Sequence, residues 1–179
     1  MSRDSVQVVI LSEDRQFECF VRRFLVQQGW DRRKIRTETL QKGKGSGEQW
    51  VRERFVIELE AYRSRSTRAA TCLIVATDAD TMTVQERINS IKSHCEDSQV
   101  AFRQDNERIA FVVPKRNIET WLEYLRGNDV DETTAYSKYA NPGDCGPDVA
   151  LLDEMCRQKK LRATPPPSLM SACAEFARL

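Results

Sequence analysis

Short apolar runs alternate with longer amphipathic segments over the first 125 residues of the chain. Four of these runs have the length and the β-branched content of buried strands. They cover residues 6–11, 35–40, 71–80 and 108–114, and two aspartates close the third. Each run is followed by a segment in which apolar residues recur at the spacing of one helix face. The alternation predicts an α/β fold with right-handed crossovers, in which helices cover both faces of a mostly parallel sheet of about four strands.

Residues that commonly cap helices mark the ends of the predicted helices. Gly29 and Gly127 stand just after apolar-periodic segments, where glycine often ends a helix. Thr83 and Glu86 have the spacing of a capping box at the start of the helix that follows the third strand. Asn117 is expected to cap the helix that follows the fourth strand. These residues predict where helices end and begin.

The pattern weakens after the fourth predicted strand and its helix. Residues 128–147 are polar and contain Gly and Pro, which predicts an excursion over the surface. Two shorter helices are predicted at 148–158 and 168–179. Because the chain is too short to build two domains that each have a sizeable core, we expect one domain. Its α/β core covers residues 1–127, and residues 128–179 add C-terminal helices.

Composition excludes several classes of site. The six cysteines show no CxxC spacing, so a structural zinc site is not expected. A histidine-rich metal site or a Ser-His-Asp triad would depend on the single histidine, His94. No apolar run approaches the ~20 residues that span a bilayer, and no signal-peptide pattern follows Met1. We therefore expect a cytoplasmic protein with reduced thiols and no membrane partner.

Charge is unevenly distributed along the chain. Residues 1–70 carry 15 Lys and Arg and 10 Asp and Glu, whereas residues 71–179 carry 13 and 17. A basic first half and an acidic second half are compatible with a phosphate-facing surface beside a metal-holding one. Ordinary surface variation is the alternative interpretation.

Carboxylates follow three of the four predicted strands. Glu13 follows the first strand, Asp78 and Asp80 follow the third, and Glu119 lies in the first turn of the helix after the fourth. Asp78 and Asp80 would point the same way if the backbone stayed extended. The carboxyl ends of parallel strands meet at one edge of the sheet, where ligands bind in such folds. The acids are therefore expected to gather there.

Gathered carboxylates need a counter-charge. Two charges ~4 Å apart repel by about 4 kcal/mol at an effective dielectric near 20. Oxygen ligands favour Mg²⁺ or Mn²⁺ over zinc, so we expect Glu13, Asp78 and Asp80 to hold such a cation. For Glu119, an alternative role is to complement the dipole of its own helix.

Basic residues near the strand ends are candidates for binding phosphate. Lys42, Lys44 and Ser46 lie in a glycine-rich loop before a helix, which is typical of a phosphate cradle, although the spacing is not that of a Walker A motif. A flexible turn is the alternative. Lys115 and Arg116 follow the fourth strand and are expected to neutralise a phosphate, or else to be solvated surface charges.

Two segments carry a family resemblance. A strand ending in glutamate and a later strand ending in Asp78-Ala79-Asp80 resemble the TOPRIM domain of topoisomerases, bacterial primases and OLD-family nucleases. Residues 114–122 have the pattern P-x-x-x-I-E-x-W-L and resemble small stand-alone TOPRIM-like proteins, often companions of an ATPase in bacterial defence systems. The resemblance covers residues 6–125. In many family members a glycine follows the glutamate and a second acid follows four residues after it, whereas here these positions are Asp14 and Phe17.

The resemblance implies a Rossmann-like TOPRIM fold and a metal-dependent nuclease acting on DNA or RNA. It implies that Glu13, Asp78 and Asp80 bind Mg²⁺ or Mn²⁺, that Glu119 assists, and that an ATPase is a partner in anti-phage defence. The C-terminal helices carry apolar residues that suit a contact between two copies of the chain, so a homo-oligomer is an alternative to a monomer. The main alternative is a non-catalytic TOPRIM-like binding or sensor subunit of an ATPase complex, which the missing second acid favours.

A receiver-like phosphoacceptor is a third interpretation. Such domains also gather acids after the first strand and an aspartate after the third, here Glu13, Asp14 and Asp78, with a late lysine, here Lys115. They contain a fifth βα unit that the sequence does not predict. A phosphatase of the haloacid-dehalogenase type needs its DxD on the first strand and fits less well.

Overall fold

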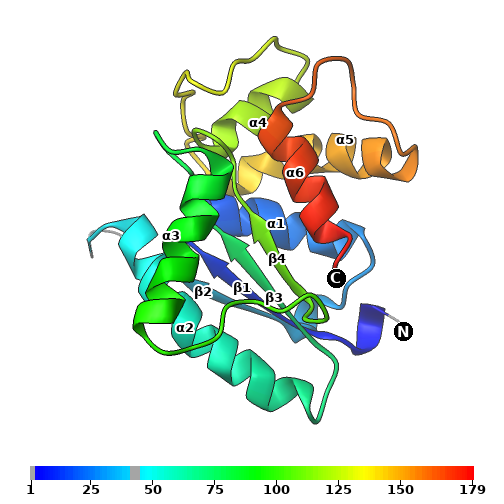
Figure 1. Cartoon of the computed structure of the whole chain (residues 1–179). Coiled ribbons are helices and arrows are strands. Elements are labelled where there is room, and N and C mark those ends of the chain that lie inside the picture. Colours follow the sequence, from blue (N-terminus) through cyan, green and yellow to red (C-terminus); the bar gives the residue numbers. More distant parts are fainter. Residues whose placement is uncertain (1–2, 41–44) are drawn as a thin grey trace.

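A four-stranded parallel sheet forms the centre of the protein, as a computed structural model describing residues 3–40 and 45–179 shows (Figure 1). Its strands lie in the order β2-β1-β3-β4. They are β1 (Gln7–Ser12), β2 (Ile35–Thr39), β3 (Thr71–Ala76) and β4 (Ile109–Val112). The predicted α/β class and its four strands are confirmed, and the architecture is Rossmann-like.

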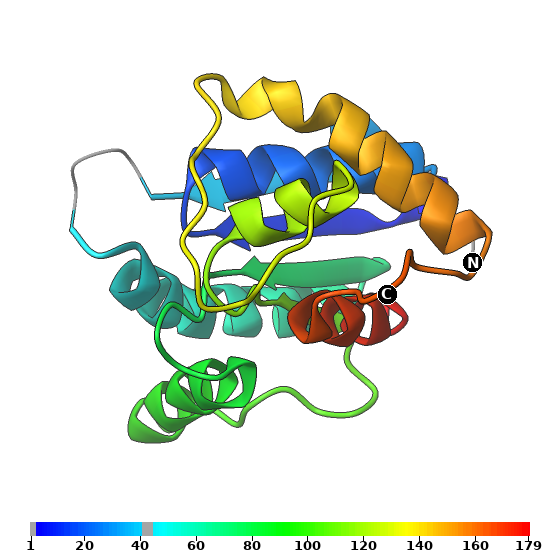
Figure 2. The same ribbon diagram turned by 90° about the horizontal axis from the view of Figure 1, so that it is seen from above.

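Helices cover both faces of this sheet (Figure 2). Those on one face are α1 (Arg15–Gln27) and α4 (Ile118–Leu125), and those on the other are α2 (Gly47–Ser66) and α3 (Val84–Asp97). Two more helices follow, α5 (Gly146–Arg157) and α6 (Pro167–Phe176). Short 3₁₀ helices span Arg3–Ser5, Arg32–Lys34 and Pro142–Cys145. The receiver-like interpretation requires a fifth strand after α4. The described residues contain no strand there.

The chain changes direction across the sheet between β1 and β3. From β1 it moves outward to β2, then crosses back to β3 and on to β4. Ser12 pairs with Ala76, so β1 and β3 end at the same level. In doubly wound sheets, ligands bind beyond the carboxyl ends of the strands at such a switch point. Glu13 and Asp78 follow these two strands within two residues of their ends.

Alternating residues of the central strands build two separate apolar cores. Val8 and Ile10 of β1 contribute to the core beneath α1, whereas Val9 and Leu11 contribute to the core beneath α2 and α3. This division follows from the two-residue period of a strand. Both central strands are therefore almost entirely apolar, as the sequence predicted.

The predicted helix ends agree with the backbone. Gly29 and Gly127 have φ angles of 85° and 105°, a region that favours glycine. Thr83 and Glu86 form the expected capping box. Asn117 is the N-cap of α4 but does not bond to a helix amide; its Oδ1 accepts a hydrogen bond from the Thr120 hydroxyl at 3.2 Å.

The connection from α4 to α5 runs across the carboxyl edge of the sheet (Figure 2). Asn117 Nδ2 donates to the Tyr136 carbonyl oxygen at 3.3 Å, and the Tyr139 amide donates to Gln16 Oε1 at 3.0 Å. After it, α5 and α6 complete the core beneath α1 through Leu152 and Leu169. Within the described residues, no helix has the length and apolar character needed to cross a bilayer.

Candidate functional site

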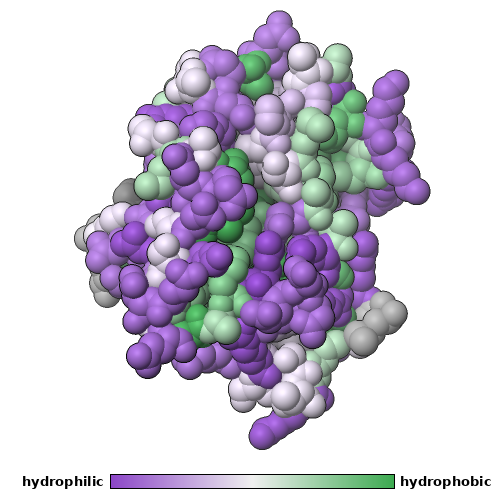
Figure 3. All heavy atoms as spheres, in the orientation of Figure 1, coloured by the Kyte–Doolittle hydropathy of each residue, from purple (hydrophilic) through white to green (hydrophobic). Residues whose placement is uncertain are grey.

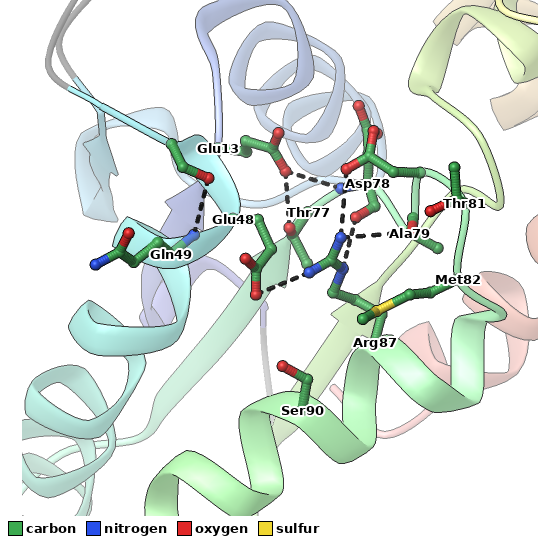
Figure 4. A network of polar contacts seen from close by, with 12 residues as sticks. Glu13, Glu48, Gln49, Thr77, Asp78, Ala79, Thr81, Met82, Arg87 and Ser90 are labelled. Carbon is green, nitrogen blue, oxygen red and sulfur yellow. Dashed lines mark hydrogen bonds and ion pairs between the residues drawn. The ribbon is translucent and has the colours of Figure 1, made fainter.

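Glu13 is held at the end of β1 by residues that follow β3 (Figure 4). Its Oε2 accepts hydrogen bonds from the Thr77 hydroxyl at 2.8 Å and from the Asp78 amide at 3.0 Å. Burial raises the pKa of Glu13, and these two hydrogen bonds offset only part of that rise. The carboxylate is therefore fixed in position and carries a charge that its surroundings disfavour.

Gly47, the first residue of α2, lies against the Glu13 side chain. A Cβ atom at this position would be 2.3 Å from Glu13 Cγ, closer than real contacts allow. Only a residue without a side chain fits here while Glu13 keeps its place. The start of α2 thus forms one wall of the site.

Asp78 has a buried carboxylate oxygen without a partner. Its Oδ1 accepts no hydrogen bond from the described residues. Burial raises the pKa of Asp78 well above its ordinary value, and the charges of Glu13 and Glu119 raise it further. A buried carboxylate in this environment favours either a proton or a cation beside it.

Asp80 is directed differently from what an extended backbone would give. β3 ends at Ala76, and Asp80 has a φ angle of 55°, so the condition for Asp78 and Asp80 to point the same way is not met. The Asp80 side chain is 52% exposed, and its Oδ2 lies 3.3 Å from Arg87 Nη2. In the structure Asp80 therefore pairs with a cation of the protein.

Arg87 of α3 organises the loop that carries both aspartates. Its buried guanidinium donates from Nε to the Asp78 carbonyl oxygen at 2.9 Å and from Nη2 to that of Ala79 at 3.4 Å. Nη1 also forms an ion pair with Glu48 Oε1 of α2 at 2.8 Å (Figure 4). No sequence pattern predicts this role, because an arginine on a helix is ordinarily a surface residue.

Glu119 is buried in the first turn of α4. Its Oε1 accepts a hydrogen bond from Gln16 Nε2 at 2.6 Å, whereas its Oε2 has no partner among the described residues. Burial raises the pKa of Glu119, which its own backbone amide and the charge of Lys138 partly offset. Its place at a helix N-terminus agrees with the dipole interpretation, but that interpretation does not explain the unpartnered oxygen.

Lys138 supplies a positive charge that the sequence did not predict. It belongs to the connection after α4, and its Nζ bonds to Asp14 Oδ2. Burial lowers the pKa of Lys138, but the contact with Asp14 and the charges of Glu119 and Asp78 outweigh burial and raise it overall. A lysine inside a polar excursion is normally solvated, so only the folded chain reveals its position beside the acids.

Among the predicted phosphate-binding residues that the structure describes, Lys115, Arg116 and Ser46, none forms an ion pair or hydrogen bond with Glu13, Asp78 or Glu119. Lys115 Nζ donates to the carbonyl oxygens of Thr81 and Met82, which holds the loop between β3 and α3. Arg116 is half-buried and forms no ion pair or hydrogen bond with any other residue that the structure describes. Ser46 is the N-cap of α2, with its hydroxyl accepting from the Gln49 amide at 3.4 Å. Lys42 and Lys44 lie outside the described residues.

The basic character of the first half is partly neutralised within the fold. Buried Glu58 of α2 lies within ion-pair distance of three arginines, Arg36, Arg54 and Arg65. Glu38 also pairs with Arg36 and Arg54, so these three arginines and two glutamates keep one excess positive charge. His94 lies in the last turn of α3, about 10 Å along the helix from Arg87, which contacts the loop that carries the aspartates.

The donor types fit a divalent cation, although the side chains do not converge as they stand. Across residues 3–40 and 45–179, no group of three or more His, Cys, Asp or Glu side chains is arranged to hold a metal ion. Nevertheless, Asp78 Oδ1 and Glu119 Oε2 are buried and unpartnered, and Glu13 lies beside Asp78. Such hard oxygen atoms are the ligands that Mg²⁺ and Mn²⁺ prefer. Their convergence on an ion would need side-chain rotation.

Comparison with known proteins found no matching family model, no matching curated protein and no matching solved structure.

Proposed function

We propose that the acidic edge formed by Glu13, Asp78 and Glu119 binds Mg²⁺ or Mn²⁺, and that the protein is a metal-dependent nuclease of TOPRIM type. The observation that carries this proposal is the pair of buried carboxylate oxygens, Asp78 Oδ1 and Glu119 Oε2, without hydrogen-bond partners in the described part of the chain. An unsatisfied buried polar group costs about 1–3 kcal/mol. Carboxylates with raised pKa values at a topological switch point are typical of functional sites.

Each residue has a defined role in the proposed hydrolysis of DNA or RNA. Glu13 and Asp78 supply oxygen ligands from adjacent strand ends, and Glu119 supplies a third from α4. Asp80 joins them if it leaves Arg87. A bound divalent ion would stabilise charge on the phosphodiester and lower the pKa of a bound water. General-base work falls to a carboxylate, because His94 is the only histidine and lies at the far end of α3.

Lys138 takes the role that the sequence assigned to Lys115. Its ammonium group contacts Asp14 beside the acids, where it can neutralise a phosphate oxygen that approaches them. Lys115 instead holds two carbonyl oxygens of the loop that presents Asp80. We therefore assign Lys115 to positioning and Lys138 to substrate charge.

The family resemblance extends the proposal to partners. It suggests that the protein works with an ATPase in bacterial anti-phage defence, as small TOPRIM-like proteins often do. The excess of arginine around Glu58 supports a nucleic-acid partner, because sequence-independent binding depends on neutralising phosphates.

A cleavage assay tests the nuclease directly. The purified protein is incubated with single-stranded and double-stranded DNA and RNA in Mg²⁺ or Mn²⁺, alongside Asp78→Ala, Asp80→Ala and the matched surface variant Asp97→Ala. Metal-dependent cleavage that is lost in Asp78→Ala and kept in Asp97→Ala supports the proposal. Cleavage that is equal in all variants comes from a contaminant or another site and contradicts it.

A specific observation also favours a second candidate, a non-catalytic TOPRIM-like subunit that binds or senses a ligand for an ATPase. Arg87 neutralises Asp80, and no three metal-binding side chains converge among the described residues. Isothermal titration distinguishes the two candidates. Heat of binding at or below millimolar Mg²⁺ or Mn²⁺ favours the nuclease, and its absence favours the non-catalytic subunit.

A further inference from the structure

A cavity of about 680 Å³ opens between α1, α5 and α6, and none of Glu13, Asp78 and Glu119 lines it. Its volume falls within the range of small-molecule sites, roughly 300–1,000 Å³. The space-filling view shows hydrophobic residues at the surface between α6 and the C-terminal part of α5, with hydrophilic residues beside them (Figure 3). Aromatic and aliphatic side chains form most of the wall, among them Phe20, Phe24, Trp121, Leu152, Met155 and Leu169.

The charged side chains that line this cavity are all basic, and the main-chain oxygen of Leu179, which also lines it, accepts a hydrogen bond from Arg108 Nη2 at 2.7 Å. Arg3, Lys159 and Lys160 line it, and no Asp or Glu does. None of the three forms an ion pair with another residue that the structure describes; Arg3 donates only to Gln28, at 2.7 Å to its carbonyl oxygen and 3.1 Å to Oε1. Arg3 also lies over the Trp30 ring, at 6.0 Å from its centroid, which leaves Lys159 and Lys160 as the cations free to meet a ligand. An apolar interior with such cations at its border is complementary to a molecule with an aliphatic tail and an anionic head.

The end of α5 places two of these cations. The Lys160 amide donates to the Met155 carbonyl oxygen at 3.0 Å and the Lys159 amide to that of Cys156 at 3.1 Å, the bonding pattern of a Schellman motif. Lys159 has a φ angle of 53° at the position where glycine is usual. Replacing Lys159 with glycine therefore removes its charge without straining the backbone.

We propose that this cavity binds an aliphatic carboxylate, a saturated fatty acid of about 8–12 carbons. The tail lies among the aromatic and aliphatic residues of α1, α5 and α6, and the carboxylate faces Lys159 and Lys160. The proposal is independent of the nuclease assignment, because the cavity and the acidic edge have no lining residue in common.

Titration calorimetry and tryptophan fluorescence test the proposal with octanoate, decanoate and dodecanoate below their micelle concentrations. Trp121 lines the cavity and reports occupancy. We expect one saturable site whose affinity rises roughly fourfold per added methylene. Decyltrimethylammonium, which has the same tail and a positive head, is expected to bind at least tenfold more weakly than decanoate.

Variants separate the tail site from the head site. Ala172→Phe fills the cavity from α6 and should weaken decanoate binding at least tenfold. Lys159→Gly combined with Lys160→Gln leaves the core intact and should weaken decanoate at least fivefold while leaving decanol unchanged. Lys92→Gln, on the surface of α3, is the matched control and should have no effect.

Several outcomes would overturn the fatty-acid site. They are no saturable binding, equal binding of decanoate and decyltrimethylammonium, or unchanged decanoate binding in the double lysine variant. Self-association that Ala172→Phe abolishes would show that a second copy of the chain occupies the cavity instead.

Discussion

Asp78 carries the least compensated charge of the site. Its amide bonds to Glu13, its carbonyl oxygen accepts from Arg87, and its buried Oδ1 has no hydrogen-bond partner in the described part of the chain. The backbone of Asp78 is thus fixed while its carboxylate is destabilised. Sites that bind cations commonly give up stability in this way.

Asp78→Asn should stabilise the metal-free protein at neutral pH. The substitution removes a buried charge while keeping the shape of the side chain, so we expect a gain of about 1 kcal/mol. For a domain of this size that corresponds to a rise in melting temperature of about 2–4 °C. Addition of Mg²⁺ should raise the melting temperature of the native protein but not of Asp78→Asn. Asp97→Asn, exposed on α3, is the control; equal melting behaviour of the native protein and Asp78→Asn would contradict the account.

The stabilisation by Asp78→Asn should depend on pH. Because the pKa of Asp78 is raised in the folded state, the folded protein binds this proton more tightly than the unfolded chain does. Its destabilising effect is therefore absent below the ordinary carboxyl pKa of about 4 and grows as pH rises through the raised pKa. Differential scanning fluorimetry without metal should show the difference between variant and native protein increasing from pH 4 to pH 8. A difference independent of pH would mean that the charge of Asp78 is not its cause.

Gly47→Ala should destabilise the protein only while Glu13 is present. The added Cβ would lie 2.3 Å from Glu13 Cγ, so we expect a loss of about 1–3 kcal/mol from overpacking. In a Glu13→Ala background the same substitution should be neutral or slightly stabilising, since alanine favours helix over glycine. Chemical denaturation of the native protein, the two single variants and the double variant measures the coupling free energy between Gly47 and Glu13. Equal effects of Gly47→Ala in both backgrounds would show that the two residues do not contact.

For single residues, the sequence predicts the position in the fold correctly where the residue directly follows a strand. Glu13 and Asp78 were predicted to approach each other because each follows a parallel strand, and the Asp78 amide does donate to Glu13. The pairing of Asp80 with Arg87 was not predictable, because it depends on a left-handed backbone at Asp80 that no glycine or turn motif marks.

Among the elements, β4 lies at one edge of the sheet, beside α6. An ion pair protects this edge. The Phe111 amide donates to Glu175 Oε2 of α6 at 2.9 Å, and the Ile109 carbonyl oxygen accepts from Arg103 Nη1 at 3.1 Å. Arg103 and Glu175 also pair with each other. Two of the backbone groups of β4 that face away from β3 are thereby satisfied, which hinders another strand from adding there.

Glu175→Ala should open this edge. We expect a loss of about 1–3 kcal/mol in the free energy of unfolding, because the Phe111 amide and Arg103 lose their acceptor. Denaturation and light scattering should show lower stability and more self-association than Glu154→Ala, an exposed glutamate of α5. Unchanged stability and a monodisperse solution would contradict a protective role for Glu175.

The sequence predicts the type of each element where the apolar pattern is regular. Predicted and observed strands and helices agree along the chain, because central strands are apolar on both faces and helices are apolar on one. The partner of the β4 edge was not predictable, because Glu175 follows in sequence more than sixty residues later, and the apolar pattern of its helix does not indicate which strand the helix packs against.

In the whole molecule, the connection from α4 to α5 is what completes the acidic edge. The sequence predicted it as a surface excursion, and it is largely exposed; Lys138 bonds to Asp14, and backbone groups of Tyr139 and Tyr136 bond to Gln16 and Asn117 around the ends of the strands. A polar segment without periodicity carries no information about which surface it covers. Right-handed crossovers determine which face of the sheet each helix covers, but the strand order itself was not predicted from the sequence.

Lys138→Gln should separate cation binding from phosphate binding. Loss of this charge leaves Asp14, Asp78 and Glu119 more negative, so Mg²⁺ affinity should rise by about threefold or more while nucleic-acid cleavage falls at least tenfold. Titration calorimetry and the cleavage assay measure the two effects. Lys34→Gln is the matched surface control. Parallel loss of both functions would show that Lys138 acts only by holding the connection in place.

We propose that the carboxylates at the ends of β1 and β3 hold a divalent cation. Crystals soaked in Mn²⁺ test this proposal, because manganese gives an anomalous signal that identifies the ion. We expect an anomalous peak beside Glu13 and Asp78, absent from crystals of Asp78→Asn. No peak there at millimolar Mn²⁺, in crystals whose acidic edge is open to solvent, would contradict it.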